Sequence, residues 1–354
     1  ACPAAYRVVR LPLPLGLAYV NGWIATLEQR CYSDPIVHQA TTKYQHLVLT
    51  RRNNDLRLYI NGHLQFSSRD EAIYHELLVH TPMSVAPSRQ RVLVLGGGDG
   101  LALREVLKYP GVREVTLVDI DPGMIRLASE HPEMIGLNEA AFHDARVFAT
   151  APPSVDSGEK ISVTLPSKLA ASGRDNTAYD VAEVQVFTLD ADEFVQQATG
   201  EFDVVIVDFP DPRSLELAKL YSVDFYRALR QRLASGALVA IQSTSPRRAR
   251  EVFQCIRESL RTAGFYSLPF HSYLNSFGDW GWHLAWTDRI DEMAMLQKLN
   301  DVERLRVSTE YLTPKAMQAA FVFGKDQFVA SDAIRANTKL RPVIVAYYRQ
   351  GFRD

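Results

Sequence analysis

The sequence predicts an α/β protein in which a doubly wound (Rossmann-like), mostly parallel sheet follows a small N-terminal antiparallel β domain. Three observations support this fold class. An apolar run at Val92–Leu95 stops at a glycine-rich turn and leads, through an amphipathic stretch, to a second apolar run that ends at Asp119. Further apolar runs alternate with helical patterns as far as about residue 290. Before residue 68, short β-like runs are separated by polar turns. Alternating strands and helices are typical of a parallel sheet that is covered on both faces.

Composition limits the function classes. The chain has 354 residues, of which 47% are hydrophobic and 23% charged, as is usual for a globular protein. A formal net charge of −2 gives no reason to expect a nucleic acid or an anionic membrane as a partner. The cysteines Cys2, Cys31 and Cys255 are far apart and lack the spacing of metal ligands. We therefore expect a reducing, cytoplasmic environment and no metal site.

Residues 1–68 are expected to form the β-rich domain. Strands are predicted at Gln45–Thr50, Leu56–Ile60 and His63–Ser67, and Asn61-Gly62 between the last two is a strong hairpin signal. The apolar stretch before them contains prolines and lacks the basic region of a signal peptide. No apolar run reaches the length of a membrane span. Because the first residue is not Met, the chain is expected to be processed or cut from a longer polypeptide.

The turn Gly96-Gly97-Gly98-Asp99-Gly100 is the most informative motif of the chain. In the order strand, glycine turn, helix, strand and acid, it predicts the first unit of a nucleotide-binding sheet. Asp119, at the end of the second strand, is placed to accept hydrogen bonds from ribose hydroxyls. Asp99 is the unusual element, since a carboxylate here would repel a pyrophosphate. It suits a ligand with a cationic amine, such as S-adenosylmethionine and its derivatives.

The remaining elements extend this α/β domain over residues 69–290. A helix is predicted at Arg69–His80, ended by Pro82, and another at Pro122–Glu130. Residues 151–180 are poor in apolar side chains and are expected to form a flexible insertion, either a surface loop or a lid. The other predicted elements are strands at Val184–Phe187, Asp203–Val207, Leu238–Ile241 and His283–Thr287, and a helix at Arg247–Ala263.

Residues 291–354 are expected to form a C-terminal extension. A helix is predicted at Met293–Arg304. The segment PVIVAYY at 342–348 is predicted to be extended.

Carboxylates follow several of the predicted strands, namely Asp99, Asp119, Asp190 and Asp208. Taken singly, an Asp after a strand is most often a helix cap or a turn residue. In open α/β sheets, however, ligands bind at the carboxyl ends of the strands, where these residues would gather. Asp208 and Asp211 are separated by a Phe-Pro pair and would make a negative pocket suited to a polycation.

The chain resembles the spermidine synthase family of polyamine aminopropyltransferases. The resemblance is carried, in family order, by Lys43–His46, Asp70–Glu76, Val94–Gly100 with Asp119–Asp121, and Asp203–Pro212. It implies a fold of the class I methyltransferase type, transfer of an aminopropyl group from decarboxylated S-adenosylmethionine to a diamine such as putrescine, and no prosthetic group. It also implies a homodimer with a small polyamine substrate.

Site roles are carried over by position. The resemblance implies that Asp208 is the general base, assisted by the Tyr74 hydroxyl. It implies that the acceptor amine is lined by Asp211 and Gln242, with Tyr273 in the place of a family tyrosine. The donor would be held by Gln45, His75, Gly96, Gly98, Asp99, Asp119 and Asp190, with Asp99 on the aminopropyl ammonium and Asp190 on the adenine.

The acceptor side departs from the family pattern. Phe209-Pro210 lies between the two acids, and Arg213-Ser214 replaces a Gly-Pro. A bulky Phe209 and an added Asp279 could accommodate a different or longer polyamine, while Trp280 and Trp282 could simply be core residues. The tail from 291 resembles bacterial members whose synthase domain follows a transmembrane region, which would make this chain the cytoplasmic part of a membrane protein.

Two other functions stay open at this point. The same fold and donor pocket could serve a methyltransferase that uses S-adenosylmethionine, although the acid pair and Tyr74 favour a cationic acceptor. A non-catalytic domain that senses a nucleotide or a polyamine is the third possibility.

Overall fold

A computed structural model describes residues 28–144, 146–149, 183–325, 327–328 and 333–352. The chain divides into two compact units, the first comprising residues 1–41 and 45–68, and the second comprising residues 42–44 and 69–354. The insertion expected at 151–180 and the apolar N-terminal stretch lie outside the described residues. Among the residues that are described, no helix is both long and apolar enough to span a bilayer.

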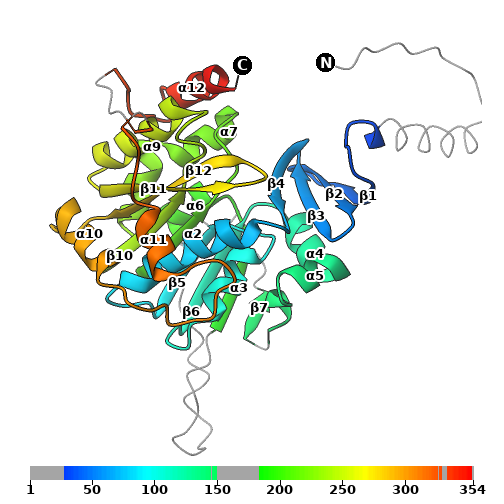
Figure 1. Cartoon of the computed structure of the whole chain (residues 1–354), viewed down its shortest axis with the longest axis horizontal. Helices are drawn as coiled ribbons and strands as arrows, with labels where there is room; N and C mark the ends of the chain where they lie inside the picture. The colour runs from blue at the N-terminus through cyan, green and yellow to red at the C-terminus, as the bar shows by residue number, and fades with distance from the viewer. Residues whose placement is uncertain (1–27, 145, 150–182, 326, 329–332, 353–354) are drawn as a thin grey trace, which may run out of the picture. The chain divides into compact units, whose positions relative to one another are not determined.

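The first unit is a four-stranded antiparallel sheet in the order β1-β2-β3-β4 (Figure 1), which confirms the predicted N-terminal β domain. Its strands are β1 (Ile36–Thr41), β2 (His46–Arg52), β3 (Asp55–Ile60) and β4 (His63–Ser67). Asn61 and Gly62 join β3 to β4 with φ angles of 52° and 77°. Two successive positive φ angles are what a type I′ hairpin turn requires, so the Asn-Gly signal was correct.

The second unit contains an eight-stranded sheet in the order β11-β12-β10-β9-β5-β6-β8-β7. The pairs from β10 to β7 are parallel, whereas β12 is antiparallel to both β10 and β11. The sheet thus has the predicted mostly parallel, doubly wound form. Its strands are β5 (Arg91–Gly96), β6 (Glu114–Asp119), β7 (Val147–Ala149), β8 (Glu183–Thr188), β9 (Phe202–Asp208), β10 (Leu233–Gln242), β11 (Tyr266–Leu274) and β12 (Gly278–Trp286).

Helices cover both faces of this sheet (Figure 1). One apolar cluster joins residues of α2, α3, α10 and α11 to alternate strand residues such as Val94 and Ile206. The other joins residues of α6, α8, α9 and α12 to the strand residues between them, such as Leu95 and Val207. The helices are α2 (Glu71–Val85), α3 (Leu101–Leu107), α4 (Pro122–Glu130), α5 (Pro132–Leu137), α6 (Ala191–Gln197), α7 (Leu215–Ala218), α8 (Val223–Arg230), α9 (Arg250–Thr262), α10 (Glu292–Asn300), α11 (Pro314–Ala319) and α12 (Val343–Gly351), with 3₁₀ turns at Ala141–His143 and Lys219–Tyr221.

Two local predictions were wrong. Helix α2 continues through Pro82 to Val85, because the last turn buries Met83 completely in the core. The segment after Pro342 is the helix α12 and not an extended strand. Proline is tolerated where a helix begins, and the β-branched run that suggested a strand instead buries Ile344 and Val345 in the second apolar cluster.

Candidate active site

The strand order reverses at β5, which pairs with β6 on one side and with β9 on the other. A crevice at such a switch point is the usual ligand site of an open α/β sheet. The ends of β5 and β9 are in register there, with Gly96 opposite Asp208. A Cβ atom on Gly96, which has a φ of +81°, would lie 2.2 Å from the backbone oxygen of Asp208. Only glycine therefore fits at the point where the turn leaves the sheet.

The glycine turn also fixes Asp119. The amide of Gly98 donates to Oδ2 of Asp119 over 3.0 Å, and the amide of Asp121 donates to Oδ1 over 2.8 Å. A Cβ atom on Gly98 would lie 2.6 Å from that Oδ2 atom. Burial raises the pKa of Asp119 to about 6 against the effect of these two hydrogen bonds. The carboxylate is thus held at the edge of the turn, where the sequence placed it.

Asp99 stands in the turn itself. Its Oδ1 accepts a 2.9 Å hydrogen bond from the amide of Leu101, the first residue of α3. Burial raises the pKa of Asp99, and the nearby charges of His75 and Glu71 act on it in opposite directions. Its negative charge in turn helps to raise the pKa values of Asp119 and Asp208.

Asp208 is the centre of the cluster. The Tyr74 hydroxyl donates to Oδ1 over 2.6 Å, and His75 Nε2 lies 4.0 Å from Oδ2. Burial raises the pKa of Asp208 to about 6, helped by the negative charge of Asp99 and opposed by His75 and Tyr74. A carboxylate whose pKa lies just below neutrality can hold an ammonium and then accept its proton.

Helix α2 presents both Tyr74 and His75, and a buried ion pair holds His75. Burial acts to lower the pKa of His75, but Glu71, with smaller effects of Asp99 and Asp208, raises it to about 9. Nδ1 of His75 lies 2.8 Å from Glu71 Oε2. Both oxygens of Glu71 in turn accept from the Arg104 guanidinium, over 2.8 and 3.1 Å. The protonated imidazole of His75 thus lies between the carboxylates of Glu71 and Asp208. The sequence motif contained Glu71, but nothing in it pointed to Arg104.

Asp211 lies in the loop after β9 and is held from three directions. Gln242 Nε2 donates to Oδ1 over 3.0 Å, Thr244 Oγ1 donates to Oδ2 over 3.3 Å, and the Tyr348 hydroxyl donates to Oδ2 over 3.1 Å. Thr244 has a φ of +61°, a strained value for a β-branched residue. The amide of Thr244 also donates to Gln242 Oε1. Gln242 and Asp211 therefore meet as predicted, whereas Thr244 and Tyr348 were missed.

Three other predicted residues have no described contact with this cluster of acids. Asp190 caps α6 through the amide of Asp192, and its Oδ2 pairs with Lys219 Nζ at 2.5 Å. Tyr273 is 66% exposed on β11, and no described contact joins it to Asp211 or Gln242. Gln45 belongs to the first unit, whereas the other predicted site residues belong to the second.

The structure also gives roles to Phe209, Asp279 and the two tryptophans near it. Phe209 is buried and packs edge-on against Tyr221 and Phe225, so it is a core residue. Asp279 contacts His271 Nδ1 at 2.6 Å across the β11–β12 hairpin. Trp280 and Trp282 are buried in the first apolar cluster. Neither Phe209 nor Asp279 is shown to line the site.

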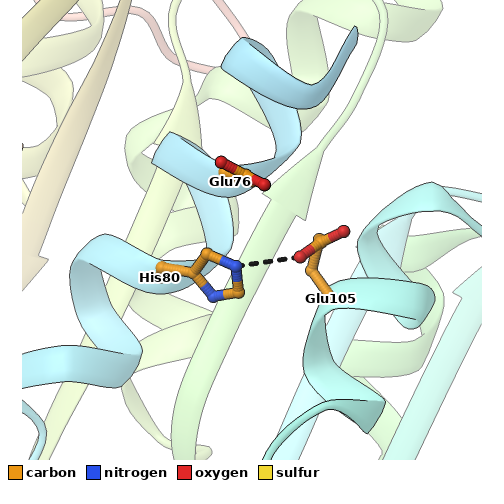
Figure 2. A group of neighbouring side chains, drawn as sticks. All are labelled: Glu76, His80 and Glu105. Carbon is orange, nitrogen blue, oxygen red and sulfur yellow. Dashed lines mark hydrogen bonds and ion pairs between the residues drawn. The ribbon is translucent and has the colours of Figure 1, made fainter. Parts of the chain in front are cut away.

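A buried group of Glu76, His80 and Glu105 has the residue types of a metal site (Figure 2). The side-chain atoms that could bind a metal ion already take part in hydrogen bonds and ion pairs, however. Glu76 accepts from the amides of residues 310–312, and His80 lies between Glu105 at 2.8 Å and the Tyr109 hydroxyl at 3.1 Å. Glu105 also accepts from Arg104 and Lys108. The group is therefore explained as a structural network that ties α2 to α3 and to the C-terminal part of the chain.

The fold and the cluster of acids at its switch point define a Rossmann-like domain with a site suited to a cationic ligand. The Spermine/spermidine synthase domain matches residues 71–150 and 165–297, more than half of the chain. The chain belongs to this family, which confirms the resemblance.

Relatives that are similar in sequence support the assignment to this family. The polyamine aminopropyltransferase of Oceanobacillus iheyensis is 34% identical over 98% of this chain and 59% of its own length. Polyamine aminopropyltransferase 2 of Ralstonia nicotianae is 41% identical over 88% of this chain and 54% of its own length. Polyamine aminopropyltransferase 2 of Bacillus cereus is 34% identical over 87% of this chain and 73% of its own length. The chain thus spans little more than half of the first two relatives.

The fold is shared with solved structures. The spermidine synthase of Thermotoga maritima superposes with a TM-score of 0.62 over 82% of this chain and 84% of that one, at 19% identity. A spermidine synthase in complex with the transition-state analogue AdoDATO superposes with a TM-score of 0.63 at 20% identity, over 82% of this chain and 85% of that one.

Proposed function

We propose that the chain is a polyamine aminopropyltransferase, which moves the aminopropyl group of decarboxylated S-adenosylmethionine to a diamine such as putrescine. The observation that carries this proposal is Asp208, with Oδ1 held by the Tyr74 hydroxyl at 2.6 Å and Oδ2 lying 4.0 Å from His75 Nε2. The relatives named above as aminopropyltransferases support it.

The donor would bind at the glycine turn. Asp99 would take the aminopropyl ammonium, Asp119 the ribose and Asp190 the adenine, with His75, Gly96, Gly98 and Gln45 completing the pocket. The ion pair of Asp190 with Lys219 means that adenine would share this carboxylate with a lysine or displace it. On the acceptor side, Asp211 and Gln242 would hold the distal ammonium of the amine, with Tyr273 near it.

The chemistry needs one base and good alignment. An alkyl amine is mostly protonated at neutral pH and cannot attack until it loses a proton. Asp208 would bind the ammonium and accept this proton while the nitrogen attacks the aminopropyl carbon next to sulfur. The carbon–sulfur bond breaks and its electron pair returns to the sulfonium, which leaves as neutral methylthioadenosine. Since the sulfonium is its own leaving-group activation, the protein's task is to align nitrogen, carbon and sulfur.

One assay tests the proposal against its rivals. The full chain is incubated with decarboxylated S-adenosylmethionine and a panel of amines, and methylthioadenosine and the extended amine are measured by mass spectrometry. Both products are expected. Conversion of S-adenosylmethionine to S-adenosylhomocysteine would instead show a methyltransferase. Donor binding without turnover of any amine would show a sensor domain.

We also propose, from the family resemblance, a cytoplasmic homodimer that works on a small polyamine. A membrane tether outside this chain belongs to the same proposal. Light scattering of the purified chain and fractionation of cells that express the whole protein would test both points. A monomer in light scattering would contradict the dimer, and the whole protein in the soluble fraction would contradict the tether.

A further inference from the structure

We infer that Tyr348 and Arg213 close the acceptor end of the site and restrict it to diamines, excluding longer polyamines as acceptors. This inference rests on the proposed function and names its acceptor class. It concerns two residues outside the roles assigned so far. Tyr348 lies on α12, beyond the region that the family domain matches, and Arg213 lies in the loop between β9 and α7.

Hydrogen bonds order the side chains of the site. Tyr74 donates to Asp208 over 2.6 Å. The Tyr221 hydroxyl donates to the backbone oxygens of Phe209 and Pro210, over 3.2 and 3.1 Å, in the loop that joins Asp208 to Asp211. Asp211 in turn accepts from the Tyr348 hydroxyl over 3.1 Å, so it links the loop of the proposed base to Tyr348.

Asp208 and Asp211 differ in the hydrogen bonds that their carboxylates accept. Among the described residues, Asp208 accepts a hydrogen bond on Oδ1 from Tyr74, and its Oδ2 has the more distant His75 Nε2 at 4.0 Å. Asp211 receives one hydrogen bond on Oδ1 and two on Oδ2, the last from Tyr348. It can attract the distal ammonium of a diamine, but the Tyr348 hydroxyl already occupies Oδ2, the oxygen that a longer chain would have to pass.

Arg213 adds a charge to this barrier. Its amide donates to the backbone oxygen of Asp211 over 2.7 Å, so Arg213 follows this acid in a tight turn. The residue is half-buried. Burial lowers the pKa of its guanidinium, and the nearby Tyr348, Asp211 and Tyr221 act to raise it. The third ammonium of a triamine would meet this guanidinium, and like charges in a partly desolvated site repel strongly. A diamine ends before that point.

The test compares acceptors in the full chain. The ratio of kcat/KM for the triamine spermidine to that for 1,4-diaminobutane is measured in the wild type and in Tyr348→Phe, Arg213→Gln and Tyr347→Phe. The first two are expected to raise the ratio about tenfold, the equivalent of 1.4 kcal/mol. Tyr347→Phe is the matched control on the same helix, since its hydroxyl meets the amide of Arg335 and not Asp211.

The possible outcomes test the inference and the proposed function separately. Transfer to amines with an unchanged ratio in Tyr348→Phe and Arg213→Gln overturns the inference alone, as does a wild type that prefers the triamine. No transfer to any amine in the wild type overturns the proposed function as well. Because Tyr348→Phe keeps the ring, this variant decides the case even where Arg213→Gln does not fold.

Discussion

The Tyr74 hydroxyl donates a 2.6 Å hydrogen bond to Oδ1 of Asp208, although the two residues are 134 positions apart in the chain. Helix α2 supplies the tyrosine and the end of β9 supplies the acid. The bond fixes the orientation of the carboxylate, whose other oxygen lies 4.0 Å from His75 Nε2. Because the hydroxyl bonds to the charged form of the acid, it also lowers the pKa of Asp208 against burial.

The first prediction concerns pH. Asp208 has a pKa of about 6, and only its carboxylate form can accept a proton, so kcat/KM is expected to rise with pH through about 6. Tyr74→Phe removes a hydrogen bond that lowers this pKa. The rise should therefore move to higher pH, by about 1 unit. Profiles of rate against pH for wild type and variant measure the shift.

A matched control is Tyr109→Phe. Tyr109 is also a buried tyrosine, but its hydroxyl meets His80 and not a site carboxylate. In Tyr109→Phe, kcat/KM should rise over the same pH range as in the wild type. A Tyr74→Phe profile that stays in place, or that moves to lower pH, would contradict the role of the hydroxyl.

The second prediction concerns the base itself. Asp208→Asn keeps the size of the side chain but cannot accept the proton, so turnover is expected to fall by roughly 10²–10⁴-fold. Donor affinity, measured by calorimetry, should stay near that of the wild type, because the glycine turn with Asp99 and Asp119 is unchanged. Asp224→Asn, at an exposed position on α8, should leave both quantities unaltered. Retention of most activity by Asp208→Asn would rule out its role as the base.

The donor side of this site could be predicted from the sequence because its residues are close along the chain. The turn at 96–100 and Asp119 are joined by one strand–helix–strand unit, and the sequence pattern defines both ends. The register of β5 with β9 then brings in Asp208 from the end of another apolar run. Each of these residues follows from the rule that parallel strands end at one edge.

The acceptor side could not be predicted in the same way. Tyr348 reaches Asp211 across 137 positions from a helix whose β-branched residues indicated a strand. Local pattern gave no signal for this contact, because it depends on how α12 packs onto α9. Arg104 was missed for a similar reason, since its partner Glu71 lies on another helix. Strand β11 was missed too, because it lacks the regular alternation that marks a half-buried strand.

The third prediction concerns the glycine turn. A Cβ atom on Gly98 would lie 2.6 Å from Asp119 Oδ2, so Gly98→Ala must displace this carboxylate. Donor affinity is expected to fall about tenfold or more, which corresponds to about 1.4 kcal/mol. Gly111→Ala is the control, because nothing lies within 4 Å of its added Cβ atom. Calorimetric titration of both variants measures the difference, and equal affinities would contradict the account of the turn.

The fourth prediction concerns the buried ion pairs behind His75. Arg104 donates to Glu71 and to Glu105, and its side chain is only 7% exposed. Arg104→Met would remove a cation that two buried acids share, leaving Glu71 with His75 and Glu105 with Lys108. This loss is expected to lower the free energy of unfolding by about 3–5 kcal/mol. Arg261→Met removes an ion pair with Glu258 whose arginine is 73% exposed, and should cost less than about 1 kcal/mol. Urea unfolding at neutral pH measures both changes.

The same ion pairs predict how stability depends on pH. Burial would raise the pKa of Glu105, but His80 and Arg104 lower it from 4.5 to about 2. A carboxyl group whose pKa is lowered by folding stabilises the fold above its unfolded value, and this contribution is lost as the pH falls toward the folded value. The wild type should therefore lose stability between about pH 4.5 and 2. In Glu105→Gln the loss over this window should be smaller, because this acid no longer titrates. An equal loss in both proteins would show that other carboxylates control acid unfolding.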